Sequence, residues 1–274
     1  MTAGTTQQAQ RADDPVGASS KEHRRIADAV PPAITFAVLT ALWYAATQFE
    51  FGLTRIPAPH EVAVAFWDMT ASGELANAFW QSGTVFLAGF FPGVIIAIVM
   101  GIVLGNIRAL DLAFSPYLYA FFSTPFIALV PLFLVIFGYG VQGKIAIVFT
   151  LVWIFVLLQT LAGIRNVDRE FHEIAESFCA PWWRRWFEVT LPAAVPFIIA
   201  GVRLGIGRAL VGVVVAEFET FVRGGFGGII MQRSQAFDLA EALVPAVVLS
   251  LIGVGLFFAL FRLELRLSAW KKSA

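Results

Sequence analysis

The stretch EIAESFCAPWWRRWFEVTLP, residues 173–192, is a hydrophilic segment set between two long apolar segments. It combines charged residues, helical spacing and a closing Leu191-Pro192. Outside it the chain is dominated by apolar runs, so this segment marks where the polypeptide leaves a hydrophobic environment and later returns to it. The pattern predicts a membrane protein that keeps a short charged helix on one side of the bilayer, where a soluble partner can reach it.

The composition supports a bilayer protein. Of 274 residues, 58% are hydrophobic and 14% are charged, whereas soluble domains carry about 25% charged residues. The formal net charge is zero, which gives no indication of a nucleic-acid partner. A single cysteine, Cys179, excludes an internal disulfide, and it shows no metal-ligand spacing with His23, His60 or His172.

Six apolar stretches are long enough to cross a bilayer as helices, which takes about 17–25 residues each. Helices are required because an unpaired backbone amide is too costly in lipid and no alternating barrel pattern is present. The predicted fold is therefore an all-α membrane bundle occupying residues 31–264, with a flexible polar tail at 1–30 and a short tail at 265–274. The predicted spans are 31–49, 80–105, 114–138, 143–164, 193–218 and 242–263.

The distribution of Lys and Arg predicts the orientation of these spans, because basic connections stay in the cytoplasm. With the N-terminus inside, thirteen Lys and Arg residues lie on the cytoplasmic side and four on the outer side, namely Arg55, Lys144, Arg223 and Arg233. Both termini and the insert at 165–192 are therefore predicted to be cytoplasmic.

Small residues and prolines indicate how the spans pack. Gly101 with Gly105, and Gly201 with Gly205, form small-xxx-small pairs that let helix backbones approach closely. Prolines near or within spans predict kinks or local unwinding; these are Pro125, Pro131 and Pro196.

The segment GYGVQGKI, residues 138–145, imitates two phosphate-binding motifs. However, Ile145 stands where a hydroxyl would bind Mg²⁺, and no strand precedes the segment. We interpret it as a glycine turn between two spans, and we expect the chain to hold no nucleotide or other cofactor of its own.

The hydrophilic insert has the signals of a short helix over residues 169–178. Asp168 is a suitable N-cap, and Glu173 and Glu176 share one face. Pro181 prevents a regular continuation. The following Trp182-Trp183-Arg184-Arg185-Trp186 places aromatic rings beside cations, as is typical of the membrane interface.

The insert resembles the EAA signature of binding-protein-dependent ABC transporter permeases. That pattern runs Glu-Ala-Ala, three residues, Gly, nine residues, an aliphatic residue, one residue, then Leu-Pro; here its positions hold Glu173, Ile174, Ala175, Cys179, Val189, Leu191 and Pro192. From Ile56 onward the chain is similar to the nitrate/sulfonate/taurine branch of that family. The stretches that carry this similarity are IPAPHEV, TPFIALVPLFLVIFGYG, GKIAIVF and GVRLGIGRALVGVVVAEF, which begin at residues 56, 124, 143 and 201.

The resemblance implies a type I importer permease in the bacterial inner membrane, working as a dimer with a second copy or a paralogue. It further implies a cytoplasmic ATPase dimer that binds ATP and Mg²⁺, and an extracytoplasmic substrate-binding protein. The coupling helix, at about 169–180, would dock on the ATPase through Glu173, Ile174, Ala175, Glu176, Cys179 and Ala180, ahead of Leu191 and Pro192.

The chain departs from the family pattern at three places. Cys179 replaces the signature glycine, and since glycine permits positive φ at little cost, a cysteine makes that turn less favourable. Ile174 replaces a small residue, and a frequent Ser-x-x-Arg pattern survives only as Ser82, with Val85 at the Arg position. A heterodimer with a better-matching partner is therefore an open alternative to a homodimer.

Three charged residues fall within the fifth predicted span: Arg203, Arg208 and Glu217. Charges inside a membrane usually face a bundle interior or a watery cavity. Arg203 has the alternative of reaching the cytoplasmic interface, whereas Arg208 lies deeper and suits a pathway for a small anion. Glu217 is expected near the outer gate, beside a glycine-rich tight element in the loop 219–241.

The sequence as a whole favours the permease subunit of an ABC importer for a small anion such as a sulfonate, taurine or nitrate. It is not expected to be an enzyme itself. Two alternatives are an ATP-independent transporter or channel, which would show inverted repeats, and an intramembrane enzyme, which would place paired catalytic residues within the spans.

Overall fold

The computed structural model describes residues 34–35, 37–48, 50–51, 54–167, 169–220 and 224–267. The chain divides into two units, Met1–Glu61 and Val62–Ala274. In the first unit, a helix at Ala37–Ala46 is followed by a small antiparallel hairpin of β1 (Glu50–Phe51) and β2 (Thr54–Arg55). The Trp43 indole N–H donates a hydrogen bond to the Pro57 carbonyl at 3.0 Å.

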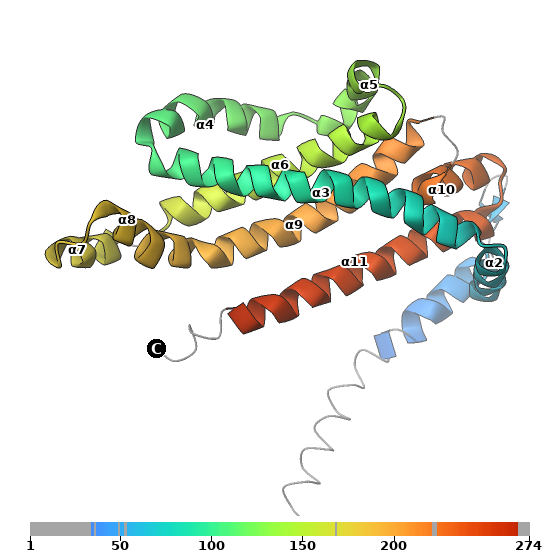
Figure 1. Ribbon diagram of the computed structural model, residues 1–274. Coiled ribbons are helices and arrows are strands. Elements are labelled where there is room, and N and C mark those ends of the chain that lie inside the picture. Colours follow the sequence, from blue (N-terminus) through green and yellow to red (C-terminus); the bar gives the residue numbers. More distant parts are fainter. Residues whose placement is uncertain are drawn as a thin grey trace, which may run out of the picture. The chain divides into compact units, whose positions relative to one another are not determined.

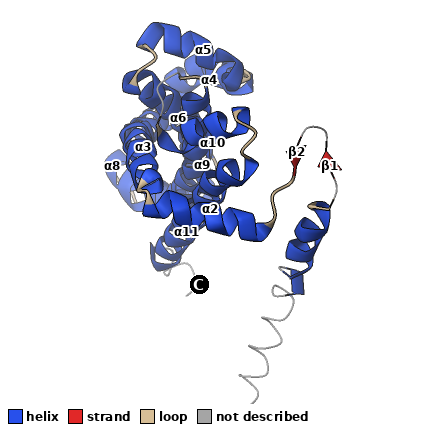
Figure 2. Ribbon diagram, turned by 90° about the vertical axis from the view of Figure 1, so that its right-hand side faces the viewer, coloured by secondary structure: helices blue, strands red, loops and turns tan. Residues whose placement is uncertain are grey.

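After α2 (Pro59–Ala71), the second unit is built of long helices. Figures 1 and 2 show α3, α6 and α9 side by side, and Figure 1 shows the short helix α7 at one end of them and α10 at the other. We name these the α7 end and the α10 end. The elements in order are α3 (Glu74–Asn106), α4 (Arg108–Ser123), α5 (Phe126–Phe137), α6 (Val141–Arg165), α7 (Arg169–Ser177), α8 (Trp182–Arg184), the π-helix η1 (Arg185–Thr190), α9 (Leu191–Phe218), α10 (Gly225–Gln235) and α11 (Leu239–Leu267).

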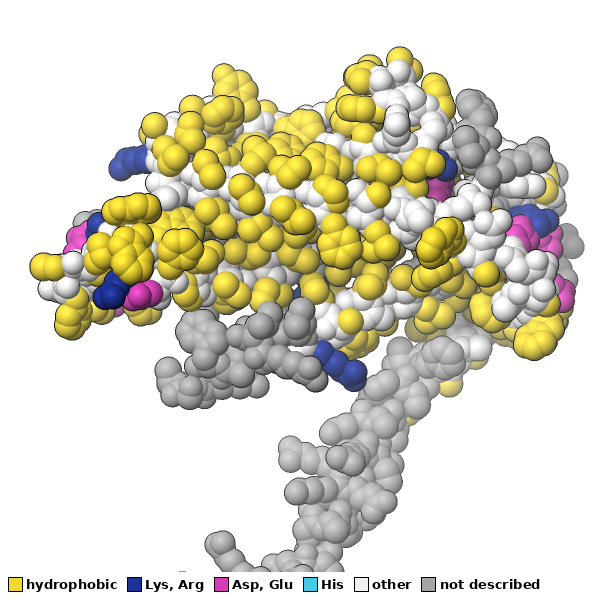
Figure 3. All heavy atoms as spheres, viewed as in Figure 1, with side chains coloured by type: hydrophobic (Ala, Val, Ile, Leu, Met, Phe, Trp, Pro, Cys, Tyr) yellow, Lys and Arg dark blue, Asp and Glu magenta, His cyan; other side chains and the backbone are white. Residues whose placement is uncertain are grey.

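Within the described residues, four continuous helices are long and apolar enough to cross a membrane: Glu74–Asn106, Val141–Arg165, Trp182–Phe218 and Leu239–Arg262. They confirm the helical membrane fold and four of the predicted spans. Figure 3 shows hydrophobic side chains along the length of these helices, with most charged side chains near their ends.

The predicted span 114–138 is not one straight helix. Arg108–Ser123 and Phe126–Phe137 meet at 100°, and the break falls at Thr124-Pro125, because the residue before a proline is disfavoured in helical geometry. The predicted span 31–49 lies partly outside the described residues, and its helix Ala37–Ala46 is shorter than a span. The count of six is thus approximate: the described part holds four spans, or five if the bent pair is one span.

The two predicted tails differ in how much of each the structure describes. The predicted tail 1–30 lies outside the described residues, as do the last residues of the tail 265–274. Helix α11 (Leu239–Leu267) continues past residue 264, whereas the part of it that could cross a membrane is Leu239–Arg262.

Helix α6 is the central span, because glycines of two neighbouring helices face it. A Cβ atom on Gly101 or Gly105 of α3 would lie 2.7 Å from the side chain of Thr160 or Ile164, respectively, and one on Gly201 of α9 would lie 2.8 Å from Gln159. Since real side chains do not approach this closely, only glycine allows these helices their observed separation. The predicted small-residue packing is confirmed.

The turn predicted over Gly138–Ile145 is confined to residues 138–140, because α6 begins at Val141. Gly138 follows α5 with φ 88° and Gly140 precedes α6. Lys144, which the sequence placed in an outer loop, instead lies buried in the first turn of α6, 5% exposed.

Candidate functional site

The hydrophilic insert joins the spans α6 and α9 and folds as α7, a tight turn, α8 and η1. Helix α7 at Arg169–Ser177 agrees with the predicted 169–178, while the proposed cap Asp168 lies outside the described residues. Glu173 and Ile174 are exposed and Ala175 is half-buried. Leu191 and Pro192 open α9 directly after the π-helix η1.

The end of α7 is closed by a Schellman motif centred on Cys179. The Cys179 N–H donates to the Glu176 carbonyl at 2.8 Å, and the Ala180 N–H donates to the Ala175 carbonyl at 3.0 Å, which are the two hydrogen bonds that define this motif. Cys179 has φ 51°, in the left-handed region that favours glycine. The cysteine therefore adopts the conformation for which the signature holds a glycine, at a steric cost that glycine would not carry.

Glu176 links α7 to the segment that leads into α9. Its carboxylate forms an ion pair with the guanidinium of Arg185, the first residue of η1. The side chains are 62% and 32% exposed, respectively, and an exposed pair of this kind contributes little stability by itself. It joins the end of α7 to the first residue of η1.

Helix α7 also carries an exposed apolar face that the sequence reasoning missed. Phe171, Ile174 and Phe178 are 51%, 54% and 82% exposed. Their spacing of three and then four residues places them on one side of the helix and could have revealed this face. The same residues border a hollow of about 400 Å³ that continues past Cys179 and Pro181. Large apolar side chains exposed together on an otherwise polar element are typical of an interaction surface.

The two arginines within α9 have different surroundings. Arg208 is exposed, and its guanidinium carbon lies 4.0 Å from the centre of the Phe155 ring of α6. Arg203 is half-buried and lies 5.2 and 5.7 Å from the ring centres of Phe257 and Phe261 of α11. Because an exposed charge within a span is costly in lipid, Arg208 indicates a watery or protein-lined space beside α9.

Glu217 lies buried at the α10 end, only 1% exposed. Its carboxylate accepts hydrogen bonds from the Ser82 hydroxyl at 2.8 Å and from the Gly227 N–H at 2.7 Å. Ser82 in turn accepts a hydrogen bond from the Phe226 N–H at 2.9 Å, and the charge of Lys144 attracts the carboxylate. Glu217 therefore joins α3, α9 and the start of α10.

The glycines around Glu217 make this closure possible. Gly225 has φ 79°, and a Cβ atom there would lie 2.1 Å from a Glu217 carboxylate oxygen. A Cβ atom on Gly227 would lie 2.8 Å from the Glu217 Cβ. The glycine-rich stretch is thus a tight element, as predicted, although residues 221–223 lie outside the described part.

The far end of α10 is held by a second charged group. Arg233 forms two ion pairs. Its Nη2 lies 3.3 Å from Oε1 of Glu74 in α3, and its Nη1 lies 2.8 Å from Oε2 of Glu241 in α11. With Glu217 at its start and Arg233 near its end, α10 fastens the ends of α3, α9 and α11 to one another.

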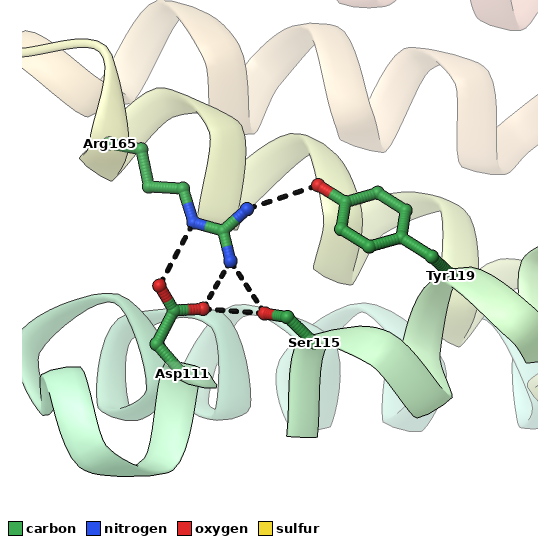
Figure 4. A network of polar contacts seen from close by, with 4 residues as sticks. All are labelled: Asp111, Ser115, Tyr119 and Arg165. Atoms are coloured by element: carbon green, nitrogen blue, oxygen red, sulfur yellow. Dashed lines mark hydrogen bonds and ion pairs between the residues drawn. The ribbon is translucent and has the colours of Figure 1, made fainter. Parts of the chain in front are cut away.

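A further polar network holds the bent pair to the central helix (Figure 4). Arg165, at the end of α6, forms an ion pair with Asp111 of α4 and donates hydrogen bonds to Tyr119 at 3.0 Å and Ser115 at 2.5 Å. Ser115 also donates to Asp111 at 2.6 Å. These contacts fix α4 at the same end of α6 from which α7 departs.

The described residues contain no group of three or more His, Cys, Asp or Glu side chains that could hold a metal ion.

The site residues that the sequence predicted fall into three separate places. These are the insert after α6, the middle of α9 and the buried cluster around Glu217.

Comparison with known proteins supports the assignment of a helical membrane protein. Residues 93–272 match the family described as "Binding-protein-dependent transport system inner membrane component". An aliphatic sulfonates transport permease of Bacillus subtilis is 30% identical over 242 residues, covering 86% of each chain. A riboflavin transport system permease of Chloroflexus aurantiacus is 32% identical over 241 residues, covering 88% of this chain and 90% of the relative. The crystal structure of an amino acid ABC transporter with histidines matches with a TM-score of 0.55 at 18% identity, over 76% of this chain and 98% of the other.

Proposed function

Because the chain belongs to the family of binding-protein-dependent transport system inner membrane components, we propose that it is the permease subunit of an importer driven by a separate ATPase. In this proposal it moves a small anion that a binding protein delivers. The chain performs no covalent chemistry, and ATP and Mg²⁺ are bound by the partner. The permease converts ATPase motion into alternating access.

One observation carries the proposal: a short polar helix between two spans presents an exposed apolar face. Phe171, Ile174 and Phe178 of α7 would fill a groove on the ATPase. Transmission of force needs a helix that does not unwind or pivot freely. The Schellman closure at Cys179 opposes unwinding, and the Glu176–Arg185 ion pair adds a link between α7 and η1. This role assigns to α7 the docking function of the EAA signature, from Glu173 through Ala180.

The pathway of the anion is proposed to run past Arg208. Its guanidinium is exposed within the span and rests on the Phe155 ring, which leaves its N–H donors free to meet an anionic group. Arg203 and Glu217 are weaker candidates for the lining, since the first packs between α9 and α11 and the second is buried. A pathway of this type would be completed by a second permease subunit, either another copy or a paralogue.

The proposal places the protein in the bacterial inner membrane with both termini in the cytoplasm. The α7 end would then face the cytoplasm and the ATPase, and the α10 end the binding protein. The relatives named for sulfonates and riboflavin differ in the solute that their names give, so the anion is assigned here only as a class, of which sulfonates, taurine and nitrate are members.

The first experiment is gentle purification of the tagged chain from its native membrane, followed by identification of each co-purifying protein and an ATPase assay. We expect a soluble ATPase subunit to be recovered with the chain. Ile174→Asp, which puts a charge into the apolar face of α7, is expected to release that subunit. Ser177→Asp adds the same charge to an exposed polar position of α7 and serves as the matched control.

Recovery of a fully active transporter without an ATPase would overturn the proposal in favour of an ATP-independent transporter. Equal loss of the ATPase from both variants would instead mean that added charge, and not the apolar face, disturbs docking.

The second experiment tests the pathway in proteoliposomes that contain the purified complex. Arg208→Ala is expected to lower uptake at least tenfold, because a charge-assisted hydrogen bond to the anion is worth about 1.5–3 kcal/mol. Arg208→Lys, which keeps the charge and loses the planar fork, should retain partial uptake. Unchanged uptake by the alanine variant, with ATPase assembly intact, would remove Arg208 from the pathway.

A further inference from the structure

A second hollow, of about 250 Å³, opens at the α7 end and shares Arg185 with the one beside α7. Asn106, Trp182, Arg185, Trp186 and Thr190 are among its lining residues. We name it the headgroup hollow. It lies where the end of α3, the end of α6 and the π-helix η1 come together, and the proposed pathway at Arg208 does not use it.

The position of the headgroup hollow coincides with a membrane boundary. Asn106 is the last residue of α3, and Ile164, which also lines the hollow, is the last but one of α6. Both helices are apolar spans that stop here. Tryptophan and arginine side chains gather at the depth of lipid headgroups, and Trp182 is 69% exposed beside the hollow.

The polar groups of the headgroup hollow are matched to an anion. The Arg185 guanidinium, the Asn106 amide and the indole N–H groups of Trp182 and Trp186 are hydrogen-bond donors, whereas the Thr190 hydroxyl donates to the Arg185 carbonyl at 3.3 Å. No Asp or Glu is among the residues that line it. Phosphate oxygens accept hydrogen bonds from such donors, and guanidinium binds them with two at a time.

The helix face next to the hollow is suited to acyl chains. Val99, Val103 and Ile107 recur every four residues at the end of α3 and beyond it, and they are 54%, 42% and 45% exposed. A lipid whose phosphate occupies the hollow would lay its chains along this stripe. A free phosphate ion would leave the stripe unused, so the combination favours a lipid.

We propose that the headgroup hollow binds the phosphate of an anionic phospholipid from the adjoining leaflet. Arg185 is the central contact, and it is also the ion-pair partner of Glu176 in α7. A bound lipid phosphate and Glu176 therefore compete for one guanidinium. Lipid occupancy loosens the link between α7 and η1, and, resting on the proposed function, this makes coupling to the ATPase sensitive to the lipid.

The test titrates the purified full-length chain with phosphatidylglycerol carrying brominated chains and follows quenching of tryptophan fluorescence, with brominated phosphatidylcholine as the reference lipid. We expect tighter binding of the anionic lipid. Arg185→Gln should weaken its apparent affinity about tenfold, as expected for a lost charge-assisted hydrogen bond. Arg184→Gln is the matched control, because Arg184 is adjacent in sequence and lines the other hollow instead.

Glu176→Gln provides a measurement in the opposite direction. It removes the competitor for Arg185 and should strengthen binding of the anionic lipid, so the test does not depend on the folding of the Arg185 variant alone. Because neither titration contains an ATPase, a failure of the docking proposal would leave these results unaffected.

Three outcomes would overturn the inference. Equal weakening by Arg184→Gln and Arg185→Gln would show general attraction to basic residues. Full protection by excess inorganic phosphate, with equal quenching by both lipids, would show a site for the free ion. Unchanged affinity in Glu176→Gln together with unchanged affinity in Arg185→Gln would show that the hollow holds no lipid phosphate.

Discussion

The two ends of the helical bundle differ in whether their charged and apolar side chains are buried or exposed. At the α10 end, Glu217 is buried and its carboxylate is held by Ser82 and Gly227. At the α7 end, the ion pair of Glu176 is exposed, and so are the apolar side chains of Phe171 and Phe178. The contrast shows an α10 end whose charged groups are satisfied within the chain and an α7 end that leaves apolar surface exposed, as the proposed docking on an ATPase requires.

At both ends a helix closes with a non-glycine residue of positive φ. Cys179 after α7 and Phe237 after α10 are the non-glycine residues with positive φ in the described part of the chain, at 51° and 61°. Each closes its helix with Schellman hydrogen bonds; for Phe237 these run from its own N–H to Ser234 and from Asp238 to Arg233. Non-glycine residues in these positions indicate that both helix ends are held firmly by what surrounds them.

The largest effect is expected from breaking the buried cluster at the α10 end. Glu217→Leu leaves the Gly227 N–H and the Ser82 hydroxyl without their acceptor, at a cost of about 1–3 kcal/mol for each unpaired donor. We expect the midpoint of thermal unfolding in detergent to fall clearly. Glu219→Gln, at an exposed position two residues later, should leave it unchanged, and a fall of equal size in both variants would contradict the special role of Glu217.

A somewhat smaller loss is expected at the glycines of the same cluster. Gly225→Ala forces an alanine into a left-handed conformation, which costs about 1–2 kcal/mol, and directs its Cβ against the Glu217 carboxylate. Gly228→Ala meets nothing within 4 Å and should gain up to about 1 kcal/mol, because alanine favours a helix over glycine. Thermal unfolding of the two variants in parallel checks the opposite signs; a matching sign would show that the turn is not tight.

At the α7 end, Cys179→Gly should stabilise the chain by about 1 kcal/mol, since glycine removes the cost of the left-handed conformation. Cys179→Ala retains that cost and should give no gain. Hydrogen exchange of the α7 amides is the measurement, with slower exchange expected in the glycine variant alone. Faster exchange in that variant would contradict the assigned closure.

The smallest effect on stability is expected at the exposed apolar face. Phe178→Ser should change the unfolding of the isolated chain by no more than about 0.5 kcal/mol, because the side chain is 82% exposed. The same variant should recover less ATPase on purification. A large loss of stability in the isolated chain would mean that Phe178 packs within the protein and is not held ready for a partner.

The long apolar segments made the spans predictable, because length and hydropathy alone decide which helices can cross a bilayer. The break at Pro125 was expected as a kink, but its size was not. How far a chain turns there depends on where the following helix packs, and for α5 this is against α6, through residues such as Val130, Leu134 and Ile147.

The candidate site was predicted unevenly for a similar reason. Local spacing identified the insert from Glu173 to Pro192, since its signal lies within one short segment. The surroundings of Glu217 were not predictable, because its partner Ser82 lies 135 residues away. Ser82 was noticed only as part of a family pattern, and nothing in its neighbourhood in the sequence indicated a buried carboxylate.

The most direct measurement is the rate at which Cys179, the single cysteine, reacts with a maleimide in the presence and absence of the ATPase subunit. Cys179 is exposed at the end of α7, so we predict rapid labelling of the free chain and strong protection by the ATPase. A variant with Cys179→Ala and Ser234→Cys moves the reporter to an exposed position of α10 and should label equally in both conditions. Unchanged labelling of Cys179 at saturating ATPase, or equal protection at both ends, would contradict the assignment of α7 as the docking element.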